Sequence, residues 1–278
     1  MTTDTEYKTI KVAIDRGVGV ITLNRPEALN TFTGGMGEEW QQAQLALAAD
    51  DDVRVIVVTG AGAAFCAGAD LSGGGDTFDK QEDMSFSSCP ITPAYQLKKP
   101  VIAACNGHAI GVGFSLALQA DFRFLSKQGK YGLLQAQRGV LADGCAHWLL
   151  PRLIGMEKAL ELMLTGQKMT GEQAHEKGLA LQVVEADQVL ETAMAFAYSL
   201  AEKSSPLVVG LAKQLMWQSH DMSAEQMEAL ETKLLHQSMG LPDAIEGGVA
   251  FMERRTPTWT SSINNDWPTW WLADEDKQ

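Results

Sequence analysis

A chain of 278 residues is long enough to bury a full hydrophobic core, and its composition is that of an ordinary soluble globular protein. The formal net charge is −13 and the basic residues form no stripe, which argues against nucleic-acid binding as a main role. An anionic small ligand is not excluded, because a few local Lys or Arg residues can bind phosphates at any net charge.

The four cysteines have neither metal-ligand nor disulfide-framework spacing, so we expect reduced thiols and no metal site. Cys66, Cys105 and Cys145 lie in apolar or Gly/Ala-rich surroundings and are expected to be buried. The first residues lack the features of a signal peptide, and no apolar run approaches the ~20 residues of a membrane span. We therefore expect a cytoplasmic protein with no membrane partner.

The first part of the chain predicts strands and one helix. Alternating residues at 9–15 and a returning strand at 18–23 predict a β-hairpin. A helix is predicted over 37–49, and an apolar strand follows over 53–59. The polar stretch 72–95 lacks a period and predicts a surface loop, which either covers a site or is an idle insertion.

Beyond this loop, strands alternate with helices and then give way to helices alone. A short helix is expected to end at Lys99. The later elements are strands at 101–105, 121–125 and 180–184, and helices at 111–120, 146–154, 157–164, 187–202, 206–219, 223–239 and 242–253, with a capping box at Thr170. This order predicts an α/β core over 1–190, a helical region over 191–257 and a Trp-rich tail over 258–278, with its Trp residues packed on the chain or on a neighbouring subunit.

Two glycine-rich turns, each fed by an apolar strand, stand out in the core. The first covers Gly60–Leu71 and the second Asn106–Gly113. We expect each to have the form of a buried strand, a tight turn and a helix start, where backbone N–H groups lack partners. Two such turns side by side could hold one carbonyl oxygen between two amides. For either turn alone, simple turn formation explains the glycines; for the pair, we favour the functional interpretation.

Other common site types match less well. The chain has neither a Gly-x-Gly-x-x-Gly directly after its first strand nor a P-loop Lys, which disfavours nucleotide binding of those kinds. Gly113–Ala117 is close to the nucleophile elbow of α/β-hydrolases. That fold would need an acid and then a His in a loop after a late strand, but the late chain is predicted to be helical.

Four segments, taken together, resemble the crotonase superfamily, the enoyl-CoA hydratase/isomerase group. They are Leu23–Asn30, Ala64–Leu71, Asn106–Gly113 and Phe251–Pro257, and the similarity covers about residues 8–257. The resemblance implies a crotonase-like α/β fold: a spiral of ββα turns, followed by helices that mediate trimers, often paired into hexamers. It also implies an acyl-CoA thioester substrate, with no cofactor beyond the coenzyme A that the substrate carries.

The resemblance further implies which residues bind the thioester. Its oxygen would accept hydrogen bonds from the backbone amides of Ala69 and Val112, where Val112 replaces a residue that is usually glycine and is expected to narrow the acyl pocket. Arg25 and Arg254 are candidates for phosphate contacts, the latter across a subunit boundary, although a solvated surface role is equally compatible with either. The residues expected to bind coenzyme A are Arg25, Ala28, Ala67, Asp70, Leu71, Ser72 and Arg254.

The proton-handling positions depart from the family pattern. Hydratases of this group use two glutamates, and the matching positions here carry Ser115 and Gln135, neither of which exchanges a proton as a carboxylate does. Asp143 matches a catalytic aspartate of other family branches, such as the aryl-CoA dehalogenase type; its alternative role is to cap the helix that follows. His147, one turn beyond, could share a proton or pack in the core.

We therefore expect an acyl-CoA thioester enzyme of the hydratase/isomerase type, distinct from an ordinary two-glutamate hydratase, with Ala69, Val112, Asp143, Gln135 and Ser115 as candidate catalytic residues. Two alternatives remain open. One is a non-catalytic acyl-CoA-binding paralogue, and the other is a hydrolase, carbon–carbon lyase or dehalogenase-type enzyme on the same fold.

Overall fold

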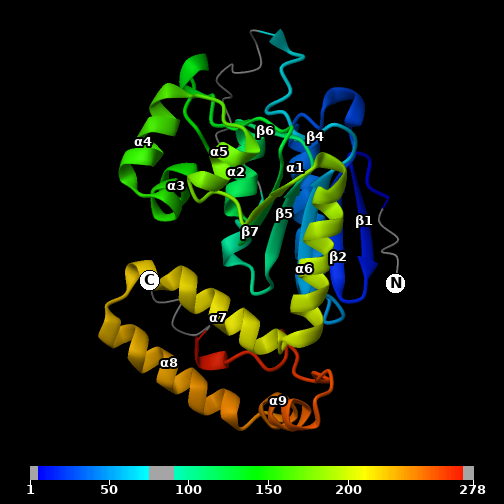
Figure 1. Cartoon of the computed structure of the whole chain (residues 1–278), viewed down its shortest axis with the longest axis vertical. Coiled ribbons are helices and arrows are strands. Elements are labelled where there is room, and N and C mark those ends of the chain that lie inside the picture. Colours follow the sequence, from blue (N-terminus) through cyan, green and yellow to red (C-terminus); the bar gives the residue numbers. More distant parts are fainter. Residues whose placement is uncertain (1–5, 75–90, 272–278) are drawn as a thin grey trace.

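The computed structural model describes residues 6–74 and 91–271, and a six-stranded sheet lies at its centre (Figure 1). The neighbour order is β1-β2-β3-β5-β7-β9. β1 and β2 form the predicted antiparallel hairpin, and the other neighbours pair in parallel. The six strands are β1 (Ile10–Asp15), β2 (Val18–Leu23), β3 (Val55–Gly60), β5 (Val101–Cys105), β7 (Phe122–Ser126) and β9 (Gln182–Val184).

A second, three-stranded parallel sheet contains β4 (Ala64–Cys66), β6 (His108–Ile110) and β8 (Tyr131–Gly132). Each of these strands follows a strand of the large sheet along the chain, so successive segments add one strand to each sheet. This alternation, with α2 (Val112–Gln119) between β6 and β7, corresponds to the predicted ββα spiral.

The helix start expected at the second glycine-rich turn is present, because α2 begins within that turn. The first turn, Gly60–Leu71, contains no helical residue, so the same expectation is wrong there. Each turn also contains a short strand that was not expected, β4 in the first and β6 in the second. Strands of three residues are too short for an alternating pattern to reveal them. The helix expected to end at Lys99 is only a single 3-10 turn, η3 (Ala94–Gln96).

The central strands β3 and β5 of the large sheet are buried on both faces, which explains their unbroken apolar sequences. Val55 and Val57 of β3 pack in one cluster with α6 (Val189–Lys203). Ile56 and Val58, which point the other way, belong to the main core with residues of α1 (Gly34–Ala49) and α2. The sheet therefore has α6 on one side and α1 and α2 on the other, and its parallel strands end near the second sheet.

Shorter helices complete the spiral around this core. α3 (Ala146–Ile154) and α4 (Met156–Thr165) lie together at one side of the molecule, followed by α5 (Gly171–Glu176) (Figure 1). Further 3-10 turns within the described residues are η1 (Pro26–Ala28), η4 (Ala136–Arg138), η5 (Ala186–Gln188) and η6 (Ser219–Asp221).

The C-terminal helices form a separate layer below the spiral in Figure 1. They are α7 (Pro206–Gln218), α8 (Ala224–Met239) and α9 (Pro242–Glu253). Trp267 and Trp271 of the tail are 7% and 6% exposed and pack against apolar residues of α7 and α8, so this part of the tail packs on its own chain. Residues 75–90, most of the predicted loop, and 272–278 lie outside the described residues.

A buried cation joins α7 to the spiral. The Lys213 ammonium lies 2.8 Å from the Asp121 carboxylate and donates hydrogen bonds to the carbonyls of Ala94 and Lys99. Burial lowers the pKa of Lys213, and the nearby Asp121 opposes this shift. Breaking a buried, fully bonded pair of this kind is strongly destabilising, so the contact fixes the helical layer on the core.

The capping box predicted at Thr170 is present at the start of α5. The Thr170 hydroxyl accepts from the Gln173 amide, and the Gln173 side chain accepts from the Thr170 amide. We expect Thr170→Ala to lower the free energy of unfolding by about 1 kcal/mol, because it removes one of these partners. Urea unfolding measures this change. Thr192→Ala, within α6, is the matched control, since its hydroxyl bonds only a carbonyl one turn earlier; equal losses in the two variants would contradict a specific capping effect.

Candidate active site

The two glycine-rich turns meet at the ends of β4 and β6, which pair in parallel. A side chain placed on Gly111 would lie 4.0 Å from Gly68 Cα and 3.8 Å from Gln135 Nε2. Gly68 has a φ of 114° and Gly111 a φ of 56°, conformations that favour glycine. The absence of side chains at these two positions leaves backbone of both turns accessible beside the Gln135 side chain.

Each turn presents an amide without an acceptor in the part of the chain that the structure describes. On the first turn, the Phe32 amide donates to the Gly68 carbonyl, and the Asp70 amide donates to the Phe32 carbonyl. The Gly68 carbonyl and the Ala69 amide share one trans peptide, in which C=O and N–H point in opposite directions, so the Ala69 amide faces away from Phe32. On the second turn, Val112 is the first residue of α2, and its amide precedes the helical hydrogen-bond pattern.

Two side-chain oxygens near these turns are also unpaired. Gln135 Oε1 and Asp143 Oδ1 are buried, and neither has a hydrogen-bond partner among the described residues. Buried polar atoms normally have a partner, so an orphaned acceptor indicates a place where a ligand or water donates. Asp143 does not cap α3, because that helix begins after Cys145 without a side-chain cap, and the capping alternative is therefore wrong.

Ser115 stands on the wall of the site with its hydroxyl already engaged. Its side chain is fully buried, and Oγ donates to the Gly111 carbonyl at 3.3 Å. A side chain on Gly144 would lie 3.1 Å from Ser115 Cβ, so the segment that carries Asp143 runs directly past the first turn of α2. The structure thereby brings Asp143, Ser115 and Val112 into one neighbourhood.

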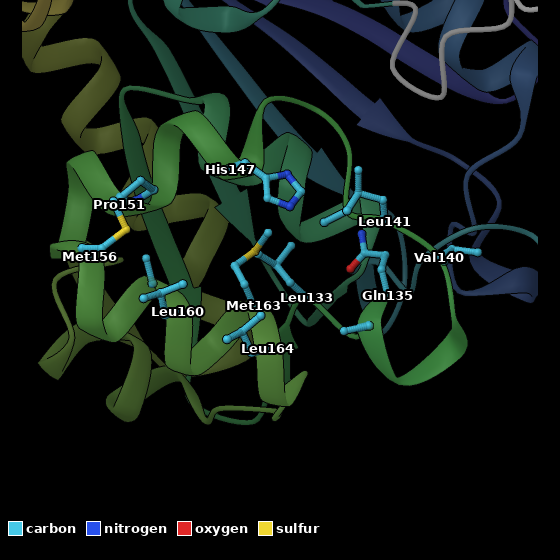
Figure 2. Close-up of a pocket in the computed structure, with 13 residues that line it drawn as sticks. Leu133, Gln135, Val140, Leu141, His147, Pro151, Met156, Leu160, Met163 and Leu164 are labelled. Atoms are coloured by element: carbon cyan, nitrogen blue, oxygen red, sulfur yellow. The ribbon is translucent and has the colours of Figure 1, made fainter.

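A pocket of about 270 Å³ lies beside Gln135, between α3, α4 and residues 140–142 (Figure 2). Gln135 and His147 are its polar side chains, and the others are aliphatic, among them Leu133, Leu160 and Met163. Figure 2 shows the imidazole of His147 pointing from α3 toward Leu141. His147 is exposed at this pocket and is not part of the packed core.

The thiols fall into two groups. Cys66 and Cys105 are buried as expected, and burial raises the pKa of Cys66 to about 11. Cys145 is exposed, so the prediction that it is buried is wrong; it takes a left-handed conformation, with a φ of 60°, in the turn before α3. Within residues 6–74 and 91–271, the structure has no cluster of side chains suited to a metal ion.

Most of the residues expected to bind coenzyme A lie together. The segment that contains Arg25 and Ala28 runs beside the first turn, where the Ala67 amide donates to the Leu29 carbonyl. Leu71 and Ser72 follow as exposed residues. Together these residues form one edge of the site next to Ala69.

Arg25 and Asp70 contact each other. Their side chains are 23% and 18% exposed, and Arg25 Nη2 lies 2.9 Å from Asp70 Oδ2. Hydrogen bonds from the Ser72 amide and hydroxyl, together with the Arg25 guanidinium, lower the pKa of Asp70 to about 2. Asp70 is therefore charged at neutral pH, and its contribution to stability is lost only in strong acid, as the pH falls toward 2.

Arg254 does not join this group within one chain. It ends α9 with a φ of 56° and is exposed. Figure 1 shows α9 at the opposite end of the molecule from β4 and β6. A contact between Arg254 and the site of its own chain is therefore excluded by the fold.

Sequence reasoning missed several residues that shape the site. Phe32 forms a parallel bridge with Ala69, and Asn30 is fully buried with a φ of 54°. Asn30 stands inside a segment that the motif comparison had singled out, and Asn tolerates the left-handed conformation, but neither fact identifies its partners. The pocket along α3 and α4 could not be recognised in the sequence, because its aliphatic lining residues look like those of a hydrophobic core.

Comparisons with known proteins give one consistent result. The family model described as enoyl-CoA hydratase/isomerase matches residues 13–262. A probable enoyl-CoA hydratase, echA8, of Mycobacterium bovis is 33% identical over 261 residues, covering 91% of this chain and 98% of the relative. The 1,2-epoxyphenylacetyl-CoA isomerase of Escherichia coli is 33% identical over 253 residues, covering 89% of this chain and 96% of the relative.

Solved structures show the same similarity. The crystal structure of a probable enoyl-CoA hydratase/isomerase from Mycobacterium abscessus has a TM-score of 0.87 and 42% sequence identity, covering 91% of this chain and 99% of the other. An enoyl-CoA hydratase structure from Mycobacterium tuberculosis has a TM-score of 0.82 and 33% identity, covering 91% and 98% of the two chains. The crotonase-like fold expected from the sequence is thereby confirmed.

Proposed function

Because the chain belongs to the enoyl-CoA hydratase/isomerase family of enzymes, we propose that it is an acyl-CoA isomerase that uses Asp143 as a single proton-transfer group. The observation that carries this proposal is the coexistence of two unpaired amides and one unpaired carboxylate oxygen around the joined glycine-rich turns. Amides stabilise a developing oxyanion, and a carboxylate accepts a proton, which are the two requirements of enolate chemistry.

The oxyanion hole of this proposal consists of the Ala69 and Val112 amides. They come from different turns that lie so close that a Cβ on Gly111 would be 4.0 Å from Gly68 Cα, and neither amide donates to another acceptor in the described chain. A thioester oxygen placed between them would receive two hydrogen bonds. The Val112 amide also stands at the positive end of α2, where negative charge is favoured.

Asp143 supplies the base in this scheme. It removes a proton from the carbon next to the thioester of a β,γ-unsaturated acyl-CoA, and the electron pair of the C–H bond moves to the thioester oxygen. The protonated Asp143, which exchanges its proton with solvent, then delivers a proton to the γ carbon, and the double bond moves to the α,β position; delivery to the α carbon regenerates the substrate. Atoms and charge balance within the substrate and one carboxylate, so the reaction needs no second acid or base.

Gln135 and Ser115 have different parts in the proposal. Gln135 Oε1 is an unpaired acceptor beside Gly111, suited to orienting a donor of the substrate or a water molecule. The hydroxyl of Ser115 is engaged by Gly111, so Ser115 forms the wall of the site. Replacement of both family glutamates removes the carboxylate pair that hydration of an enoyl-CoA would use, and this favours isomerisation over hydration.

The pocket between α3 and α4 is the proposed place for the acyl group. Its volume of about 270 Å³ exceeds the ~150 Å³ cavity that is known to hold a benzene molecule, so an aryl or medium-length aliphatic group fits. The coenzyme A moiety would leave along Ala28, Ala67, Leu71 and Ser72. No cofactor beyond this moiety is required by the proposed chemistry.

A homotrimer, or a pair of trimers, is the assembly that we propose. Arg254 lies far from the site of its own chain, so a contact with coenzyme A requires another copy of the chain.

Among the described residues, no helix is long and apolar enough to cross a membrane.

The decisive experiment supplies the purified protein with β,γ-unsaturated acyl-CoA in D₂O. We expect conversion to the α,β isomer, with deuterium incorporated next to the thioester by exchange at the carboxylate. α,β-Unsaturated acyl-CoA is the matched substrate for hydration. Rapid hydration without isomerisation would overturn the proposal, and binding of both thioesters without turnover would instead identify a non-catalytic acyl-CoA-binding paralogue.

A further inference from the structure

The segment Arg25–Phe32 is bonded along the whole length of the first glycine-rich turn. Asn30 Nδ2 donates to the carbonyls of Ala61 and Ala64 at 2.9 and 2.8 Å, while Oδ1 accepts from the Arg25 amide at 2.8 Å. The Asn30 side chain is 0% exposed. Since its amide hydrogens and its oxygen are all used, Asn30 fixes the separation between the two stretches of backbone.

The same segment sets the direction of the Ala69 amide. The Phe32 amide donates to the Gly68 carbonyl at 2.8 Å, and the Asp70 amide donates to the Phe32 carbonyl at 2.9 Å. The Gly68 carbonyl and the Ala69 N–H belong to one trans peptide and point to opposite sides, so these bonds hold the Ala69 N–H on the side away from Phe32. Any rotation of this short segment would turn the Ala69 N–H away from the second turn.

Arg25 makes two further contacts next to the bridge between Phe32 and Ala69. Its Nη1 donates to the Thr31 carbonyl at 2.7 Å, and its Nη2 donates to Asp70 Oδ2 at 2.9 Å. The guanidinium therefore joins the residue before Phe32 to the residue after Ala69. A planar fork with two donors can make both contacts at once, which a point charge such as an ammonium cannot.

From these contacts we infer that Arg25 and Asp70 are positioning residues, whose ion pair holds the Ala69 amide in the orientation that the thioester oxygen requires. This inference rests on the proposed function of the Ala69 amide. It replaces a phosphate-binding role for Arg25, because both arms of the guanidinium are used within the chain. Asp70 acts on the site through the backbone that it shares with Ala69 and touches no reacting atom.

The test compares Arg25→Met, Asp70→Asn and the double variant in one steady-state assay with the β,γ-unsaturated acyl-CoA. We expect each single change to lower kcat by about 10- to 100-fold, because small displacements of a catalytic group have effects of this size. The double variant should be no more than about twofold worse than either single one, since the same contact is removed once. Additive losses would overturn the pairing.

Binding measurements separate positioning from phosphate recognition. Affinity for free coenzyme A, which has no thioester oxygen, should be unchanged in both variants. Acetoacetyl-CoA forms an enolate that places negative charge on that oxygen. Its affinity should fall about tenfold, which is the effect of losing about one hydrogen bond. Weaker binding of free coenzyme A by Arg25→Met, with normal or stronger binding by Asp70→Asn, would show that Arg25 binds phosphate and would overturn the inference.

Arg25→Lys and a remote ion pair provide the controls. Lysine keeps the charge but loses the fork, so positioning predicts a kcat close to that of Arg25→Met, whereas rescue by lysine would contradict it. Lys127→Met and Glu185→Gln break an exposed ion pair of 2.7 Å and should leave kcat unchanged. If the wild-type chain binds free coenzyme A but not acetoacetyl-CoA, the proposed oxyanion hole is wrong. If the wild-type chain binds both ligands and the variants bind acetoacetyl-CoA as tightly as the wild type does, only the positioning role is wrong.

Discussion

Replacement of Asp143 by asparagine is expected to lower kcat for isomerisation by about 10²- to 10⁴-fold, the usual contribution of a positioned acid or base. Asparagine has nearly the same shape but cannot accept the proton from the substrate carbon. Deuterium exchange next to the thioester should fall by the same factor. Rates of both processes, measured on the same preparation, test this prediction.

The fold should tolerate this change, which makes the result interpretable. Asp143 Oδ1 is buried without a partner, and burying an unpaired carboxylate oxygen is costly, so a neutral amide at this position should not lower the free energy of unfolding. Asp187→Asn, at an exposed position in η5, serves as the control for the chemistry of the substitution. Unchanged exchange in Asp143→Asn would remove Asp143 from the mechanism.

Val112→Pro is expected to lower kcat by about 10²- to 10³-fold, because proline has no N–H and removes one donor of the oxyanion hole. The position is unusually suited to this test. Val112 is the first residue of α2, where proline is tolerated and no intrahelical hydrogen bond is lost. Gly111 precedes it and has no Cβ to clash with the proline ring.

Val112→Ala is the matched control, since it shortens the same side chain and keeps the amide. Val112 is 6% exposed, so both variants should be checked by thermal unfolding. An intact fold with low activity in Val112→Pro, and much higher activity in Val112→Ala, would assign the effect to the N–H group. Equal activities would exclude the Val112 amide from the oxyanion hole.

The main features of the fold were predictable because they rest on local patterns. The hairpin, the apolar strands and the last four helices, α6 to α9, were expected within a few residues of their observed bounds. Prolines at the starts of α7 and α9 and the capping box at Thr170 gave clear local signals. The short strands β4, β6 and β8 could not be expected, since their stability comes from pairing with one another.

The candidate site was predictable in part. The two glycine-rich turns were predictable, because such turns have a sequence signature. The choice of the Ala69 and Val112 amides came from the family resemblance and stays a prediction. The sequence does not show whether an individual side chain is buried or already hydrogen-bonded. Cys145 was expected to be buried and is exposed, and the helix-capping alternative for Asp143 disappears only because α3 starts after Cys145.

The sequence by itself determined the family, the spiral fold and the two turns, since these depend on residues that are close together in the chain. Only the tertiary structure decided which side chains are free. Arg25 and Asp70 are 45 positions apart and become partners through strand pairing, and Arg254 is carried away from the site by the packing of the C-terminal helices. A residue type states which bonds it can make; the folded chain determines which of those bonds are already made.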